Sequence, residues 1–323
     1  MSLEYTQALV VTGPDQFGLQ QVKLRPLGSE EIRVRTHYTS ISAGTERMLL
    51  RGQLVEMAGL PFPCIPGYET VGEVIEVGPE VPEPQFWLGR MAFIGGSYGY
   101  EGVTSAWGGQ AQYVSADYRK AFLLPEKLDP ALAVAIAPAA TAWHGIELAA
   151  PAPGERVLVL GQGPIGQFAA QAASLRGADV AVADLSAERL ARCVAGEPKI
   201  DLSRETLKER LNGPLDLLID ATGKMEALAT HLMSVRPRGK VLLLGFYQRI
   251  DLPFAIPFLK ELSFQPSREW AAEDIPAVGQ ALAEGHLQAE HMFTARFQIS
   301  RIHEAYAAAL DPAAGLKVLI EWP

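Results

Sequence analysis

A glycine-rich turn near the middle of the chain constrains the possible folds more than any other feature. The turn, Gly161-Gln-Gly163-Pro164-Ile165-Gly166, follows a short apolar run, Arg156-Val-Leu-Val-Leu160, that is typical of a buried strand. An alanine-rich stretch over residues 167–176 then predicts a helix, and a second apolar run over 180–183 ends at Asp184. This pattern is the fingerprint of a dinucleotide-binding βαβ unit: a strand, the glycines, a helix, a second strand and an acid at its end.

Each position in this turn has a physical task. Gly161 permits the tight turn, Gly163 lets a pyrophosphate approach the backbone, and Gly166 lets the helix pack closely on the strand. Pro164 and Ile165 open the helix, whose free N–H groups attract phosphate. We therefore expect the turn to bind a dinucleotide cofactor.

Asp184 indicates which dinucleotide is bound. A carboxylate at the end of the second strand accepts hydrogen bonds from the adenosine ribose hydroxyls and repels a 2′-phosphate, so NAD is expected in preference to NADP. Arg189 follows closely and is long enough to reach such a phosphate, but we interpret it as part of a solvated helix face.

Two further strands, each with a loop at its carboxyl end, continue the predicted sheet over residues 217–223 and 239–247. Ligands of open parallel sheets bind beyond the carboxyl ends of the strands, so both loops are expected to face the cofactor. The residues expected to contact it there are Thr222, Gly245 and Phe246. Residues 262–264 predict the last strand of this sheet.

The part of the chain before about residue 124 has short strand-like runs separated by glycine and proline, which favours an irregular β-barrel. The predicted organisation is α/β, with a catalytic barrel domain over 1–124 and a doubly wound, Rossmann-type parallel sheet over 125–265. Residues 266–323 are expected to return and complete the barrel domain, with a helix over 271–284.

Composition excludes several classes of protein. The chain has 323 residues and a net charge of -9, which argues against a nucleic-acid partner. Residues 1–20 lack the pattern of a signal peptide, and the apolar stretch 131–150 is interrupted by Pro138, His144 and Glu147, which favours a buried helix over a membrane span. A cytoplasmic location is the default expectation. The two cysteines, Cys64 and Cys193, are too few for a disulfide framework.

Motifs spread over the whole chain carry a family resemblance: Ser42-Ala-Gly-Thr-Glu46, Pro66-Gly-Tyr-Glu69, Gly108-Gly109, the glycine turn and Gly315-Leu-Lys-Val-Leu319. With them the chain resembles the medium-chain dehydrogenase/reductase superfamily. Leu244-Gly-Phe-Tyr247 and Pro257-Phe-Leu-Lys-Glu261 make it similar, within that superfamily, to the 3-hydroxyethyl bacteriochlorophyllide a dehydrogenases of bacteriochlorophyll biosynthesis. The resemblance implies a GroES-like barrel, oxidation of a secondary alcohol to a ketone with NAD, and a homodimer joined at the edge strand 262–264.

The chain departs from the zinc-dependent members of this superfamily at every ligand position. Ser42 and Ala43 stand where the first cysteine ligand is expected, and Tyr68 replaces the histidine of the usual Gly-His-Glu triplet. The stretch Ala137–Ala140, which matches the third ligand, contains no cysteine or acid. Because a catalytic zinc needs three good protein ligands, we expect none to be bound.

Without a metal, side chains must handle the proton while hydride moves to or from the nicotinamide. Tyr68 lies where a zinc ligand would project, and Thr45 matches the family's proton-relay hydroxyl. Glu46 and Glu69 are expected to orient these hydroxyls, and His144 is a further candidate. The alternatives are that Tyr68 only fills space and that His144 is an ordinary hydrogen-bonded helix histidine.

The stretch 86–109 is rich in aromatic residues and glycine, which suits either a flat apolar substrate such as a macrocycle or simple packing on the barrel. Three functions stay open: an alcohol dehydrogenase, a zinc-free quinone or enone reductase using NAD(P)H, and a non-catalytic NAD sensor. Asp184 counts against the second, because such reductases commonly favour NADPH.

Overall fold

The computed structural model describes residues 3–311 and 315–323, and the chain divides into two compact units. Unit 1 comprises the described parts of Met1–Ala137 and Ala289–Pro323, and unit 2 comprises Pro138–Gln288. The chain therefore passes into unit 2 within helix α5 (Ile136–Ala149) and returns after residue 288. The sequence placed these transitions earlier, near residues 124 and 265.

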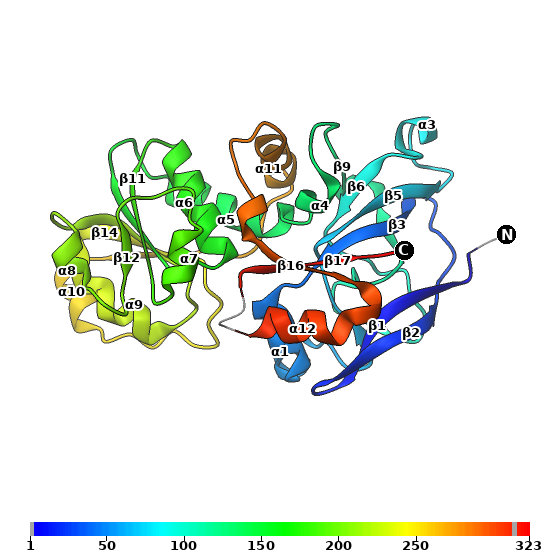
Figure 1. Ribbon diagram of the computed structural model, residues 1–323, viewed down its shortest axis with the longest axis horizontal. Helices are drawn as coiled ribbons and strands as arrows, with labels where there is room; N and C mark the ends of the chain where they lie inside the picture. Colours follow the sequence, from blue (N-terminus) through cyan, green and yellow to red (C-terminus); the bar gives the residue numbers. More distant parts are fainter. Residues whose placement is uncertain (1–2, 312–314) are drawn as a thin grey trace. The chain divides into compact units, whose positions relative to one another are not determined.

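Unit 1 is rich in β-structure, as its short apolar runs predicted (Figure 1). Its strands are β1 (Tyr5–Gly13), β2 (Gln16–Lys23), β3 (Glu31–Ser40), β4 (Cys64–Ile65), β5 (Thr70–Val77), β6 (Met91–Ile94), β7 (Thr104–Ser105), β8 (Tyr113–Asp117), β9 (Ala121–Leu123), β16 (Phe293–Gln298) and β17 (Lys317–Glu321). Its helices are α1 (Ala43–Leu50), α2 (Gln53–Ala58), α3 (Pro84–Trp87), α4 (Pro130–Ala133) and α12 (Ile302–Leu310).

The strands of unit 1 form two sheets, with the orders β2-β1-β4-β7 and β16-β17-β3-β5-β6-β9, and β8 also pairs with β3. The last strand of the chain, β17, lies antiparallel to β3, with Ile320 opposite Thr39. The C-terminal segment thus completes a sheet that begins near the N-terminus, as the returning segment predicted.

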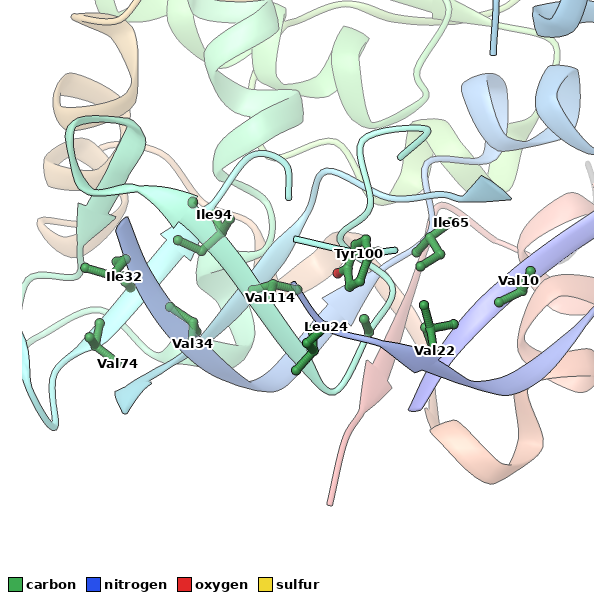
Figure 2. Close-up of a cluster of buried hydrophobic side chains, with 14 of the residues drawn as sticks. Val10, Val22, Leu24, Ile32, Val34, Ile65, Val74, Ile94, Tyr100 and Val114 are labelled. Atoms are coloured by element: carbon green, nitrogen blue, oxygen red, sulfur yellow. The ribbon is translucent and has the colours of Figure 1, made fainter. Parts of the chain in front are cut away.

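Branched aliphatic side chains fill the interior of unit 1 (Figure 2). Val10 and Ile32 are fully buried, and Val34 and Val114 lie opposite each other on β3 and β8. Burying such side chains contributes about 1.5–3 kcal/mol each, which holds the two sheets together. Tyr100 reaches the same cluster and donates its hydroxyl proton to the Gly108 carbonyl at 2.6 Å.

The aromatic stretch 86–109 is more ordered than a flexible loop. It contains α3, β6 and β7, and the side chains of Phe93 and Tyr100 are buried, with exposures of 1% and 9%. Tyr98 and Phe86 remain exposed, at 64% and 53%. Most of this stretch therefore packs on its own unit, which is the simpler of the two interpretations of its aromatics.

Unit 2 is built on one parallel sheet with the strand order β12-β11-β10-β13-β14-β15. Its strands are β10 (Arg156–Leu160), β11 (Asp179–Asp184), β12 (Lys199–Asp201), β13 (Leu215–Asp220), β14 (Val235–Leu243) and β15 (Ser263–Pro266). Its helices are α5, α6 (Pro164–Leu175), α7 (Ala187–Ala191), α8 (Leu207–Arg210), α9 (Met225–His231), α10 (Ala255–Lys260) and α11 (Asp274–Ala283). The order reverses between β10 and β13, which confirms the predicted doubly wound sheet.

The predicted helix over 271–284 is present as α11, but it belongs to unit 2 rather than to the returning segment. Two contacts hold this part of the chain there. His144 Nδ1 lies 2.9 Å from Asp274 Oδ2, and the amide of Gln171 exchanges hydrogen bonds with the backbone of Gln288. Neither contact has a local sequence signal, which is why the sequence predicted this helix in the returning segment and not in unit 2.

The apolar stretch 131–150 forms α4 and α5, in agreement with the prediction of buried helices. Its residues Ala139, Ala140 and Ile146 are almost fully buried. Over the described ranges, no helix is long and apolar enough to cross a membrane.

Candidate active site

Three hydroxyl groups meet in unit 1, and we call Ser42, Thr45 and Tyr68 the hydroxyl cluster. Tyr68 Oη lies 2.5 Å from Ser42 Oγ and 3.0 Å from Thr45 Oγ1. Ser42 is the N-cap of α1 and Thr45 lies in its first turn, so the helix start presents both hydroxyls on one side. The structure thus brings together two residues that the sequence singled out, Thr45 and Tyr68, and adds Ser42 as a hydrogen-bonding member.

The surroundings of Tyr68 keep its phenol protonated. Burial is the main cause that raises the pKa of Tyr68, and the neighbouring Glu69 carboxylate raises it further. The ring packs edge-on against Trp107, with 5.3 Å between the ring centroids. The side chain is only half-buried, so part of it remains open to a ligand.

Glu46 is buried directly beneath the hydroxyl cluster. Its Oε1 accepts a hydrogen bond from the backbone N–H of Ser42 at 2.9 Å, and its Oε2 accepts one from the phenol of Tyr306 on α12. Burial raises the pKa of Glu46 to about 7, against the opposing effect of these hydrogen bonds. The carboxyl group therefore fixes the start of α1 and, with it, the position of Ser42.

Glu69 is the second buried acid, and it forms an ion pair with Lys317 of β17. Ser40 also donates its hydroxyl proton to Glu69, and Lys317 Nζ lies 3.3 Å from the carbonyl of Ile41. Burying an unpaired carboxylate is costly, and the ammonium group offsets that cost. These contacts connect the residue after Tyr68 and the two residues before Ser42 to Lys317 of the C-terminal strand.

Lys317 and Tyr306 were not predicted from the sequence as site residues. Lys317 is part of the Gly315–Leu319 motif, but no role was assigned to it. A lysine in an otherwise apolar strand run was a usable signal, because such a side chain needs a buried acid as its partner. Tyr306 lies in a helix whose alanine-rich sequence offers no comparable signal.

The donor set of unit 1 does not fit a tetrahedral zinc ion. Ser42 and Tyr68 supply neutral hydroxyls, whereas zinc sites use thiolate, imidazole and carboxylate. Both carboxylates nearby are already engaged, Glu69 by Lys317 and Glu46 by Tyr306. In the part of the chain that the structure describes, no group of at least 3 His, Cys, Asp or Glu side chains is arranged to hold a metal ion.

His144 lies on α5, which belongs to unit 2 from residue 138 on, whereas the hydroxyl cluster belongs to unit 1. Its Nδ1 contacts Asp274 at 2.9 Å, and the same carboxylate oxygen accepts the N–H of Ala271 at 2.6 Å. Asp274 therefore fixes the orientation of the imidazole ring. This arrangement suits a hydrogen-bonded helix histidine, and it leaves Nε2 as the nitrogen available to another group.

The glycine turn has the geometry that its sequence requires. Gly161 adopts a φ of 91°, in the left-handed region that favours glycine. A Cβ on Gly166 would lie 1.8 Å from the Gly161 carbonyl oxygen, so only glycine fits there. Gly163 caps α6, and Pro164 and Ile165 form its first turn. The helix N-terminus is thus bare of side-chain caps and is open to a phosphate.

Asp184 ends β11 beside this turn. Its Oδ2 accepts the N–H of Gln162 at 2.6 Å, and its Oδ1 accepts the N–H of Ser186 at 2.8 Å. These bonds hold the carboxylate at the carboxyl edge of the sheet while each oxygen keeps a lone pair for a ribose hydroxyl. Arg189 is half-buried on α7.

The loops after β13 and β14 are joined to each other. Thr222 and Gly223 follow β13, and Gly245 and Phe246 follow β14. A Cβ on Gly245 would lie 2.4 Å from Gly223 N, so the two backbones are in contact. Phe246 is 56% exposed. The structure therefore places the predicted cofactor residues of both loops together at one edge of the sheet.

Both units match known protein families. Residues 28–126 match the alcohol dehydrogenase GroES-like domain, and residues 164–284 match the family described as zinc-binding dehydrogenase. The 2-desacetyl-2-hydroxyethyl bacteriochlorophyllide A dehydrogenase of Cereibacter sphaeroides is 28% identical, over 98% of this chain and 98% of its own. The L-galactonate-5-dehydrogenase of Escherichia coli K12 is 36% identical, over 62% and 61% of the two chains.

Solved structures agree on the fold. An alcohol dehydrogenase of Escherichia coli CFT073, crystallised with NADH, superimposes with a TM-score of 0.86 at 24% identity and covers 99% of this chain and 100% of its own. With two domain families in the expected order and relatives that span nearly its full length, the chain belongs to the medium-chain dehydrogenase/reductase superfamily and is an oxidoreductase of the alcohol dehydrogenase type.

Proposed function

We propose that the protein is an NAD-dependent, zinc-independent dehydrogenase that oxidises a secondary alcohol to a ketone. The observation that carries this proposal is the hydroxyl cluster, which offers hydrogen bonds to a substrate oxygen. In its sequence motifs Ser42 and Tyr68 match two of the usual metal-ligand positions, and Thr45 matches the family's proton-relay hydroxyl. The glycine turn and Asp184 of unit 2 support the cofactor part of the proposal, since they are suited to hold the phosphates and the adenosine ribose.

The chemistry divides between cofactor and protein. When bound, a nicotinamide cofactor would supply the acceptor for the hydride of the carbinol carbon, and the proton of the substrate hydroxyl would be left to the side chains of the protein. Tyr68 and Thr45 share a hydrogen bond of 3.0 Å, and both side chains are partly exposed. A proton received from the substrate at one oxygen is therefore matched by release of a proton from the other oxygen to solvent water. Because the pKa of Tyr68 is raised, the phenol acts as a relay and donor rather than as a standing base.

Glu46 and Glu69 hold the hydroxyl groups of this relay in position. Glu46 holds the Ser42 backbone, and the Glu69–Lys317 pair holds the chain beside Tyr68. Both acids are buried with exposures of 2%, so neither is open to exchange protons with bulk water directly. We assign them to orientation of the hydroxyl cluster.

The proposed substrate is the 3-hydroxyethyl group of a bacteriochlorophyllide. The full-length similarity to a bacteriochlorophyllide dehydrogenase supports this choice, as do the exposed rings of Tyr98 and Phe86, which can pack on a flat macrocycle.

The test is incubation of the purified protein with 3-hydroxyethyl bacteriochlorophyllide a and NAD⁺, with NADH formation followed at its absorbance band. We expect the acetyl product and NADH in equal amounts, and little turnover with NADP⁺. Sugar acids and simple enones with NAD(P)H serve as comparison substrates. Turnover confined to enones and NADPH would replace this proposal by the enone reductase alternative, and binding of NAD⁺ without any turnover would favour the sensor.

A further inference from the structure

A carboxylate without a cationic partner is buried in unit 2. Asp220, the last residue of β13, has an exposure of 0%. Its oxygens accept the N–H of Thr222 at 3.1 Å, the hydroxyl of Thr222 at 2.6 Å, and the phenol of Tyr247. These donors are neutral, and across residues 3–311 and 315–323 no ion pair includes Asp220. Hydrogen bonds from Thr222 and Gly223 oppose the rise in the Asp220 pKa that burial causes.

The place of Asp220 in the sheet identifies the part of a dinucleotide that it would affect. The glycine turn and Asp184 follow β10 and β11, in the half of the sheet that takes the adenosine nucleotide. The other half, β13 to β15, begins across the reversal of strand order and takes the second nucleotide. Asp220 ends the first strand of that second half.

Tyr247 is the positioning residue that holds this carboxylate. Its hydroxyl bonds Asp220, and a Cβ on Gly245 would lie 2.9 Å from the same hydroxyl oxygen. The backbone N–H groups of Leu244 and Gly245 also donate to the Asp220 carbonyl, at 2.9 and 3.0 Å. The carboxylate is thus fixed between the loops after β13 and β14.

We propose that the Asp220 carboxylate makes the protein discriminate between the two redox forms of its cofactor, by favouring the positively charged nicotinamide of NAD⁺ over the neutral ring of NADH. The inference rests on the proposed nicotinamide dependence. An anion in a poorly solvated site attracts a nearby cation far more than water would allow, and the reduced ring has no charge to attract. Weaker retention of NADH would help the reduced cofactor to leave after turnover.

The test is a set of dissociation constants for NAD⁺, NADH and ADP-ribose, measured by calorimetry on the wild type and on Asp220→Asn. Asparagine keeps the size of the side chain, accepts from Thr222 and donates to the Tyr247 oxygen, so the hydrogen bonds can be preserved. We expect NAD⁺ binding to weaken about tenfold relative to NADH. ADP-ribose, which lacks the nicotinamide, should bind with unchanged affinity.

Asp216→Asn is the matched control. Asp216 lies on the same strand at its opposite end, where it accepts from the backbone of Arg156 at 2.8 Å and pairs with Arg236. This variant also removes one carboxylate from β13, but at the edge away from the cofactor loops. The ratio of NAD⁺ to NADH affinity should stay at the wild-type value.

An unchanged ratio of NAD⁺ to NADH affinity in Asp220→Asn would overturn the inference. Equal weakening of the binding of both forms is one such outcome, and it would indicate that Asp220 has only a structural role. If Asp220→Asn does not fold, the double variant Asp220→Leu/Tyr247→Phe replaces the buried pair by apolar side chains and must show the same shift in ratio. Failure of the wild type to bind either redox form would instead contradict the proposed function.

Discussion

At the scale of single residues, the hydroxyl of Thr45 is the most direct place to test the chemistry. Thr45→Val keeps the β-branched shape and removes the hydroxyl, and Tyr68→Phe keeps the ring. We expect turnover to fall by about 10²–10⁴-fold in Thr45→Val and by less in Tyr68→Phe, since general acid/base groups contribute on this scale. Steady-state kinetics and NAD⁺ titration should show lower kcat with nearly unchanged cofactor affinity.

A loss confined to KM in these variants would indicate uniform binding with no special stabilisation of the transition state. If both variants turned over at the wild-type rate, the proton path would lie elsewhere. His144→Gln would then be the next variant to measure, because Asp274 leaves the His144 Nε2 available.

Asp184 decides cofactor choice in our proposal. Its carboxylate is held by the N–H groups of Gln162 and Ser186, in a position to accept ribose hydroxyls and repel a 2′-phosphate. NAD should therefore bind more tightly than NADP, and Asp184→Ala should narrow or reverse this difference in a fluorescence titration. A wild-type preference for NADP would show that this interpretation of β11 is wrong.

Glu46 should make stability depend on pH. Its pKa in the folded protein is about 7, above the ordinary value of 4.5, so the protonated form favours folding. The contribution of Glu46 to the free energy of unfolding is therefore fully present below about pH 4.5. It is lost as the pH rises through 7, by about 3 kcal/mol in total. Glu46→Gln mimics the protonated acid and should remove this decrease, so that it exceeds the wild type in stability at pH 8 but not at pH 4.5.

Denaturant unfolding at both pH values provides the measurement, and Glu56→Gln on the exposed side of α2 provides the control. The control should change stability little at either pH. If Glu46→Gln were less stable than the wild type at pH 8, the buried carboxylate would be better compensated by Tyr306 and Ser42 than its raised pKa implies.

At the scale of elements, the edge of the parallel sheet is the feature most open to association. Among the described residues β15 pairs with β14 alone. Helix α10, which ends just before β15, carries exposed Phe258 and Leu259, and its N-cap Phe254 is also exposed. Unpaired edges invite pairing, so we expect a two-fold dimer with twice the 34.9 kDa chain mass in sedimentation experiments. Phe258→Glu/Leu259→Glu should shift the equilibrium toward monomer.

Leu175→Glu is the comparison variant, because Leu175 is also exposed, at 49%, but ends α6 rather than flanking the sheet edge. It should leave the dimer intact. A monomeric mass for the wild type at micromolar concentration would contradict association through β15.

At the scale of the whole molecule, we expect no resident zinc ion in either chain of the predicted dimer. Hydroxyls at the usual ligand positions and carboxylates engaged elsewhere give the metal no adequate donors. Elemental analysis should find much less than one zinc per chain, and chelators should leave activity unchanged. One tightly bound zinc per chain, lost together with activity on chelation, would refute the metal-free proposal.

Features that depend on neighbours along the chain could be predicted from the sequence alone. The geometry of Gly161 and Gly166 follows from sterics within one turn, and the parallel strands follow from apolar runs with glycine-rich ends. The substitutions at Ser42 and Tyr68 were also visible in the sequence, because local motifs frame them.

The partners that these residues contact depend on the tertiary fold. Tyr306 and Glu46 are 260 positions apart, and Lys317 and Glu69 are 248 apart, yet each pair shares a buried contact. His144 and Asp274, and Asp220 and Tyr247, are joined in the same way. Burial and neighbouring charges set the pKa of an ionisable group. Both depend on segments that are far apart in the sequence, so no local pattern predicts them.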